Sequence, residues 1–160
     1  MGNTYQFRAL TKEEAAQVDM GGSSNIRSIK AISQDFGNDC AKIYGNLITL
    51  FGQPLYQSAD LENQYEYCVE AKDPNGNVLY LSAYSGPSGP AIGGFHGPQA
   101  SRAADELADF ILNAEPADYG YSGIYMDGPC KVEMGVKHGQ PYWNETELEM
   151  TEGDWEKFTF

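Results

Sequence analysis

Apolar side chains recur at three- and four-residue steps over residues 35–51, which is the spacing of one face of an α-helix. Ser33 or Asp35 can cap the start of this helix, and Gly52 followed by Pro54 ends it. The pattern therefore predicts a long amphipathic helix from about Asp35 to Phe51. Its inward positions are Phe36, Cys40, Ile43, Tyr44, Leu47, Leu50 and Phe51.

Two further segments have helical signals. A second amphipathic helix is predicted from about Pro98 to Asn113, with Ala103, Leu107, Phe110 and Ile111 inward. A third is predicted over residues 11–20, where Thr11 precedes Glu13 and Glu14 and the two acids lie near the positive end of the helix dipole.

Residues 65–72 alternate between apolar and polar side chains, as a half-buried β-strand does. The next five residues, 73–77, read Asp-Pro-Asn-Gly-Asn, and Pro and Asn-Gly supply the dihedral angles of a tight turn. Residues 78–84 then return as a second strand. This β-hairpin is the most strongly indicated piece of tertiary structure in the chain.

The remaining elements are shorter. Residues 85–94 are rich in Gly and Pro and predict an irregular loop, while residues 26–32 alternate too ambiguously to assign. Strand-like runs follow at 124–126, 131–136 and 141–143, with a turn at His138-Gly139 between the last two. Together these elements predict a single α+β domain over 1–160, with a mostly antiparallel sheet and two main amphipathic helices packed on one of its faces.

The composition agrees with a packed domain. The hydrophobic fraction is 41%, with 11 Tyr, 7 Phe and 2 Trp, which is too apolar for a disordered chain. Three widely spaced cysteines (Cys40, Cys68 and Cys130) are typical of reduced, mostly buried thiols rather than a disulfide framework. No apolar run has the length of a membrane span, and the first residues do not resemble a secretory signal. We therefore expect a cytoplasmic protein.

The charge of the chain narrows its possible partners. It has 23 Asp and Glu against 10 Lys and Arg, a formal net charge of −13. Repulsion among this many like charges lowers the stability of the folded chain. The net charge is therefore a candidate for a property that is retained because the function needs it. Such a field repels the phosphates of nucleic acids and anionic lipids, and it attracts basic proteins. We expect no nucleic acid and no membrane among the partners.

Catalytic signals are weak by comparison. The Gly-rich stretch 85–94 could cradle an anion before the following helix, but it lacks the spacing of known phosphate-binding loops, and two prolines remove N–H donors. Ser88 is not in the spacing of a nucleophile elbow, and nothing in the sequence ties His96 or His138 to it. We expect no catalytic residues.

Metal-binding signals are no stronger. The turn 73–77 begins like a calcium-binding loop but has Tyr84 where a closing Glu is needed, and no zinc-ligand spacing occurs. We expect neither a metal nor a cofactor.

Aromatic residues mixed with carboxylates are the better candidates for a binding surface, because Tyr and Trp bury a large area with few rotatable bonds. Two interpretations stay open. The tyrosines either lie at an interface or line the core face of a sheet. The acidic tail, residues 145–160, either complements a basic surface or is solvated. The predicted partner-binding residues are Asp118, Tyr119, Tyr121, Tyr125, Asp127, Glu145, Glu147, Glu149, Asp154 and Trp155.

Three segments resemble a known group of proteins: Phe51-Gly52-Gln53-Pro54 closing a helix, Tyr65-Glu66-Tyr67 opening a hairpin, and AYSGPSGPAIGG at 83–94. Over about residues 35–130 the chain resembles immunity proteins of bacterial polymorphic-toxin and contact-dependent competition systems. The resemblance implies an α+β fold and a non-catalytic inhibitor that occludes the active site of a cognate toxin with a basic surface. It implies no specific binding residues.

Two other functions are alternatives. One is a small enzyme or anion-binding protein that uses the Gly-rich stretch 85–94 and His96. The other is an acidic inhibitor that mimics nucleic acid, although its carboxylates are not spaced regularly like phosphates along the chain.

Overall fold

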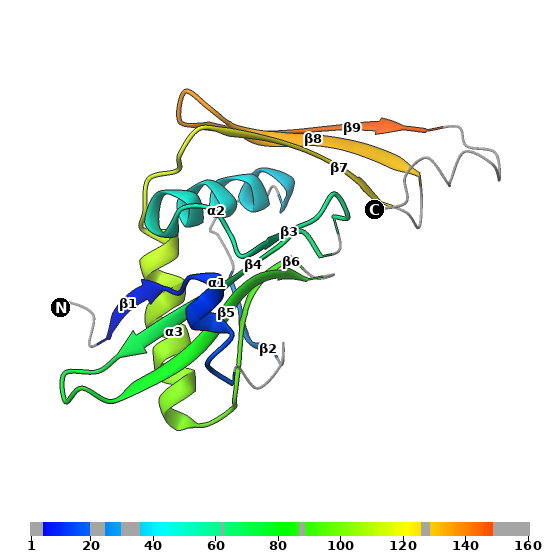
Figure 1. Cartoon of the computed structure of the whole chain (residues 1–160). Helices are drawn as coiled ribbons and strands as arrows, with labels where there is room; N and C mark the ends of the chain where they lie inside the picture. Colours follow the sequence, from blue (N-terminus) through cyan, green and yellow to red (C-terminus); the bar gives the residue numbers. More distant parts are fainter. Residues whose placement is uncertain are drawn as a thin grey trace.

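The computed structural model describes residues 5–19, 25–29, 36–61, 63–86, 89–125 and 129–148. The predicted α+β class with mostly antiparallel pairing is confirmed, and the strands divide between two sheets (Figure 1). Sheet A has the order β1-β4-β5-β6-β2, and β3 also pairs with β4. Its strands are β1 (Gln6–Ala9), β2 (Asn25–Ser28), β3 (Tyr56–Gln57), β4 (Tyr65–Lys72), β5 (Val78–Gly86) and β6 (Gly89–Gly93). Sheet B consists of β7 (Tyr119–Tyr125), β8 (Cys130–Lys137) and β9 (Gln140–Glu147).

The hairpin of β4 and β5 is confirmed in its strands and in its turn. Oδ1 of Asp73 accepts hydrogen bonds from the backbone N–H groups of Asn75 and Asn77, both at 2.9 Å. Gly76 has a φ of +86°, which a residue with a side chain rarely adopts. The side chain of Asp73 therefore closes the turn, and the register that follows places Glu70 opposite Tyr80 and Glu66 opposite Tyr84.

The prediction of an irregular loop over residues 85–94 is wrong. Strand β5 continues to Gly86, and β6 pairs with it from Gly89 onward. All residues of β6 are buried, and β6 lies between β5 and β2, so its sequence shows no alternation of polar and apolar positions. Gly and Pro, which usually mark loops, concealed a central strand here. Gly89, with a φ of +100°, lies against the ring of Phe36, where a Cβ would be 2.9 Å from the nearest ring carbon.

Two assignments in the N-terminal part also change. The helix predicted over 11–20 is the single turn α1 (Lys12–Ala15), capped by reciprocal hydrogen bonds between Thr11 and Glu14. It buries no residue, so no apolar face extends it. The ambiguous stretch near residue 26 contributes β2, which pairs with β6 at one edge of sheet A.

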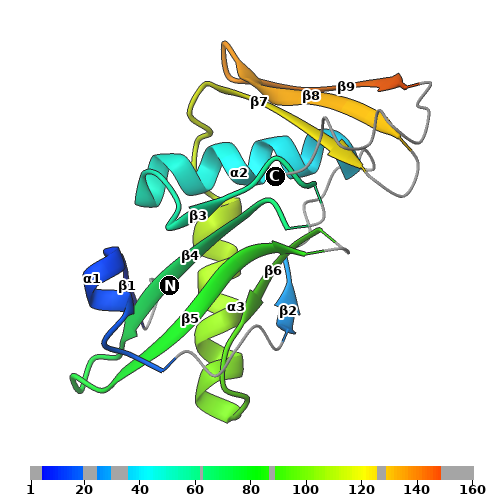
Figure 2. The same ribbon diagram turned by 45° about the vertical axis from the view of Figure 1, so that its right-hand side comes forward.

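The two main helices, α2 (Phe36–Phe51) and α3 (Pro98–Leu112), are confirmed. Helix α3 covers one face of sheet A with Ala103, Leu107 and Ile111 buried beneath it. Helix α2 lies between sheet A and sheet B (Figure 2). Nδ2 of buried Asn46 donates a hydrogen bond of 2.9 Å to the carbonyl of Ile111 and so joins the two helices.

Sheet B packs on α2 through a row of small residues. A Cβ on Gly37 would lie 2.6 Å from Cγ of Trp143, and a Cβ on Gly45 would lie 3.1 Å from a methyl carbon of Val136. Ala41 is positioned midway between the two glycines, four residues from each, so all three lie on one side of the helix. From sheet B, Val132, Met134 and Val136 are buried. The strands are longer than predicted, and His138 and Gly139, both with positive φ, form the predicted turn.

Candidate functional site

Tyr119 and Tyr121, two of the predicted partner-binding residues, face the core. The hydroxyl of Tyr119 donates a hydrogen bond of 2.8 Å to the carbonyl of Ala41, and that of Tyr121 donates to the carbonyl of Ser58. The ring of Tyr44 lies 5.0 Å from that of Tyr119 and 6.5 Å from that of Tyr121. Both side chains are half-buried, and burial raises the pKa of both hydroxyls. Of the two interpretations, the structure places these tyrosines on the core face of a sheet.

Asp118 holds a turn of sheet B. Its carboxylate accepts hydrogen bonds from the backbone N–H of His138 at 2.9 Å and of Gly139 at 3.1 Å. These two bonds lower the pKa of Asp118. The carboxylate is exposed to solvent, but its hydrogen-bond donors are backbone N–H groups of the turn between β8 and β9, so Asp118 stabilises its own sheet.

Three other predicted residues, Tyr125, Glu145 and Glu147, lie at the end of sheet B that is remote from the turn at 138–139. The ring of Tyr125 lies 6.4 Å from that of Trp143, and Nε1 of Trp143 donates a hydrogen bond of 2.8 Å to Glu145. Glu147 stands opposite Cys130 in the register of β8 and β9. The remaining predicted residues, Asp127, Glu149, Asp154 and Trp155, lie outside the described residues.

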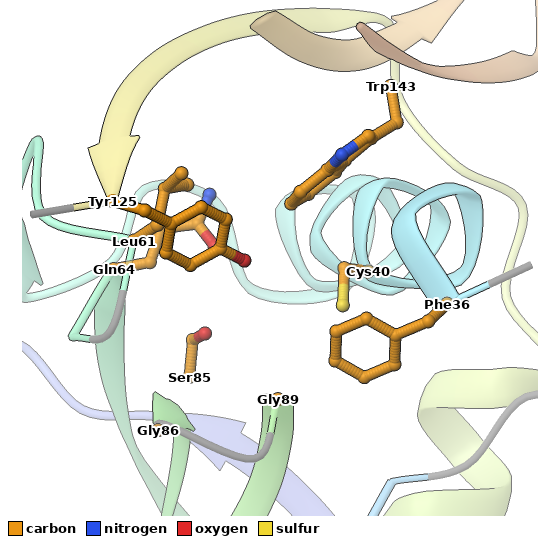
Figure 3. Close-up of a pocket in the computed structure, with 9 residues that line it drawn as sticks. All are labelled: Phe36, Cys40, Leu61, Gln64, Ser85, Gly86, Gly89, Tyr125 and Trp143. Atoms are coloured by element: carbon orange, nitrogen blue, oxygen red, sulfur yellow. The ribbon is translucent and has the colours of Figure 1, made fainter. Parts of the chain in front are cut away.

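A small hollow lies between this end of sheet B, the start of α2 and the β5–β6 hairpin (Figure 3). Trp143 and Tyr125 border it from sheet B and Cys40 from α2, while Ser85 lies on the side of the hairpin. Its volume of about 20 Å³ is enough for one water molecule. Burial, with a smaller contribution from the charge of Asp39, raises the pKa of Cys40 to about 12, so the thiol is not a nucleophile near neutral pH.

A larger hollow of about 250 Å³ lies on sheet A, close to the same hairpin. The register of sheet A places Tyr56 opposite Glu66 and Glu66 opposite Tyr84. Residues directly opposite each other in antiparallel strands project to the same face, so the three side chains form one row across β3, β4 and β5. Its lining residues are Tyr56, Asn63, Tyr65, Glu66, Tyr84, Ser85 and Gly86.

This row lies on the outer face of sheet A, which we define as the face opposite to Tyr65, Tyr67 and Val69 of β4. Along β4, Tyr65, Tyr67 and Val69 are buried, whereas Glu66 and Glu70 are half-exposed. The next row on the outer face holds Cys68 and Ser82, which are both buried, and the row after it holds Arg8, Glu70 and Tyr80. Arg8 pairs with Glu70 at 3.2 Å and with Glu14 at 2.9 Å. Two rows of the outer face thus combine tyrosine and carboxylate, and in the row next to the hollow Glu66 lies between Tyr56 and Tyr84.

Of the residues of the catalytic alternative, the structure describes His96 and the stretch 85–94 apart from residues 87–88. His96 is exposed and follows the end of β6 that is remote from the hairpin turn. The two ends of β6, a strand of five residues, are about 13 Å apart, so His96 lies at least one strand length along the chain from the hairpin turn. Ser88 lies outside the described residues. Within the described ranges, no group of three or more His, Cys, Asp or Glu side chains could hold a metal ion.

Sequence reasoning did not nominate Tyr56, Glu66 or Tyr84 as site residues. The signal was present for two of them: the alternation of residues 65–72 puts Glu66 on the polar face, and the turn at 73–77 fixes the register that brings Tyr84 across from it. Tyr56 belongs to β3, a strand of two residues, which is too short to show a period.

In the part of the chain that the structure describes, no helix has the length and apolar character needed to cross a membrane. No protein-family model, curated protein or solved structure matches this chain.

Proposed function

We propose that this chain is a non-catalytic inhibitor of the immunity type, which binds a basic effector domain of a bacterial toxin and blocks its active site. Its net charge of −13 means that thirteen carboxylates stay uncompensated even if every Lys and Arg neutralises one acid. A field of this sign steers a basic domain toward the protein and raises the association rate.

The observation that carries the proposal is the outer face of sheet A. It presents Tyr56, Glu66 and Tyr84 in one row beside a hollow, and Tyr56 is 53% exposed. Tyrosines contribute most where they fill the centre of a protein interface, and carboxylates next to them select a partner of positive charge. Inhibition then needs only that the bound chain covers the cleft of the effector.

The test measures association with an effector domain encoded beside the gene of this chain. We expect the chain to inhibit that effector at a one-to-one ratio, with an association rate that falls steeply as salt rises. Glu66→Lys, on the outer face of sheet A, should lower the association rate about tenfold at low salt and flatten its salt dependence. Glu133→Lys makes the same charge change on β8, where Glu133 is 59% exposed, and serves as the matched control.

Equal effects of Glu66→Lys and Glu133→Lys would show that only the net charge matters and that sheet A is not the interface. Absence of binding to every neighbouring effector domain would refute the inhibitor itself. The double variant Glu147→Lys/Glu149→Lys tests the predicted acidic tail in the same assay. An unchanged association rate in that variant would assign the tail to solvated surface.

A further inference from the structure

We propose that the hollow on sheet A binds the side chain of an arginine that the basic partner inserts between Tyr56 and Tyr84, with its guanidinium on Glu66. This inference rests on the proposed function and names the contact that the partner makes.

The geometry follows from the register of three strands. Glu66 pairs with Tyr56 on one side and with Tyr84 on the other. Directly opposite residues of antiparallel strands have Cβ atoms about 4.5–5.5 Å apart, so both rings start within reach of the same carboxylate. Two aromatic walls and one acid therefore border a single hollow.

The chemistry of this lining fits a cation with a flat, delocalised charge. The face of a tyrosine ring carries negative electrostatic potential and attracts a cation within about 6 Å of its centre. A guanidinium stacks on such a face and can still donate two parallel hydrogen bonds to a carboxylate. A lysine ammonium is a more strongly hydrated point charge and gains less from two flat walls.

The size of the hollow also favours a single side chain. Its volume of about 250 Å³ lies below the ~300–1,000 Å³ of pockets that hold complete small molecules. It is open at the surface, where Tyr56 is exposed, so a side chain from a docked protein can enter. Burial, and after it the charge of Glu66, raises the pKa of Tyr84, which keeps the ring neutral under physiological conditions.

The test uses the full chain and three capped tripeptides, acetyl-Gly-Xaa-Gly-amide, in which Xaa is arginine, lysine or citrulline. Citrulline has nearly the shape of arginine without its charge. We follow the backbone amide resonances of the chain by NMR. The arginine peptide should shift the amides of Glu66 and Tyr84 saturably, with a dissociation constant in the millimolar range because only one side chain binds. The lysine peptide should bind more weakly, and the citrulline peptide should produce no saturable shift.

Variants assign the binding to the hollow. Tyr84→Leu and Glu66→Gln should each weaken the arginine peptide by about two- to thirtyfold, whereas Tyr84→Phe, which keeps the ring, should bind as the native chain does. Tyr80→Leu removes a tyrosine of the same face from the row of Glu70, beyond the pair of Cys68 and Ser82, and is the matched control, expected to leave binding unchanged. Native-like amide spectra of the free variants verify that they fold.

Several outcomes overturn the proposal: saturable binding of the citrulline peptide, a lysine peptide that binds as tightly as the arginine peptide, equal losses in Tyr84→Leu and Tyr80→Leu, or shifts remote from the hollow. Tighter binding of choline than of the arginine peptide would assign the hollow to a small quaternary ammonium instead.

The proposed inhibitor function and the proposed arginine contact can be refuted separately. A chain that inhibits an effector but ignores the arginine peptide refutes only the arginine contact, and the reverse result refutes only the inhibitor.

Discussion

A Cβ atom added at Gly37 tests how sheet B packs on α2. A Cβ built there lies 2.6 Å from Cγ of Trp143 and 2.7 Å from Cδ2, whereas ordinary contacts begin at about 3.4 Å. Gly37→Ala therefore forces the indole of Trp143 away from α2. Because Trp143 lies on β9 and opposite Met134 of β8, the displacement also disturbs the packing of sheet B.

Two effects of opposite sign determine how much Gly37→Ala changes the free energy of unfolding. Overpacking of this kind typically costs ~1–3 kcal/mol. Alanine in place of glycine inside a helix gains up to ~1 kcal/mol, and somewhat less in the first turn, where Gly37 lies. We expect Gly37→Ala to lower the free energy of unfolding by about 1 kcal/mol. In a chain that already carries Trp143→Ala both ring contacts are gone and only the contact with the Cβ atom at position 143, at 3.0 Å, remains, so the same substitution should change the free energy of unfolding much less.

Urea denaturation of the native chain, the two single variants and the double variant gives the four free energies. The double-mutant cycle isolates the Gly37–Trp143 coupling, expected at ~1–3 kcal/mol. Equal effects of Gly37→Ala in both backgrounds would mean that Trp143 does not pack on Gly37, and the attachment of sheet B described above would be wrong.

Three further predictions follow from other contacts. Tyr119→Phe loses the hydrogen bond to Ala41 and should lower the free energy of unfolding by about 0.5–1.5 kcal/mol; an unchanged value in urea denaturation would contradict that bond. Cys40, with a pKa of about 12, should resist iodoacetamide at pH 8 in the folded chain and react in 8 M urea, as mass spectrometry of the labelled peptides can show; rapid labelling of the native protein would refute its burial. The backbone N–H groups at 138–139 lower the pKa of Asp118 below its unfolded value of ~3.9, so its contribution to stability is present above that pH and is lost as the pH falls through the folded-state pKa. Asp118→Asn should therefore be less stable than the native chain at pH 6, and the difference should shrink at pH 2–3 in urea denaturation.

The elements with a regular period could be predicted from the sequence. Helix α2 and the hairpin of β4 and β5 have long apolar repeats or a turn whose residues leave few alternatives. Strand β6 could not be recognised, because a buried strand made of Gly, Pro, Ala and Ile has no polar face to alternate with its apolar one. The very short strand β3 fails for a different reason, since two residues contain no period at all.

The division into two sheets was also missed. The predicted inward face of α2 consists of its large apolar residues, and these mark mainly the side toward sheet A and α3, although the ring of Tyr44 also lies 5.0 Å from that of Tyr119 in sheet B. The side toward sheet B is marked by Gly37, Ala41 and Gly45, and small residues spaced four apart add little to the apolar periodicity from which a helix face is predicted. The candidate site shows the same limit: Glu66 and Tyr84 could be paired from the hairpin register, but the hollow beside them depends on β3.

The row of Gly37, Ala41 and Gly45 leaves no room between helix and sheet. Sheet B therefore cannot slide or tilt without van der Waals overlap or loss of the Tyr119 hydrogen bond to Ala41. The carboxylates of Glu145 and Glu147 thus project from a platform whose position relative to sheet A is fixed before any partner arrives. A partner that touched both sheets would meet a rigid template, and little of its binding free energy would be spent on ordering this chain.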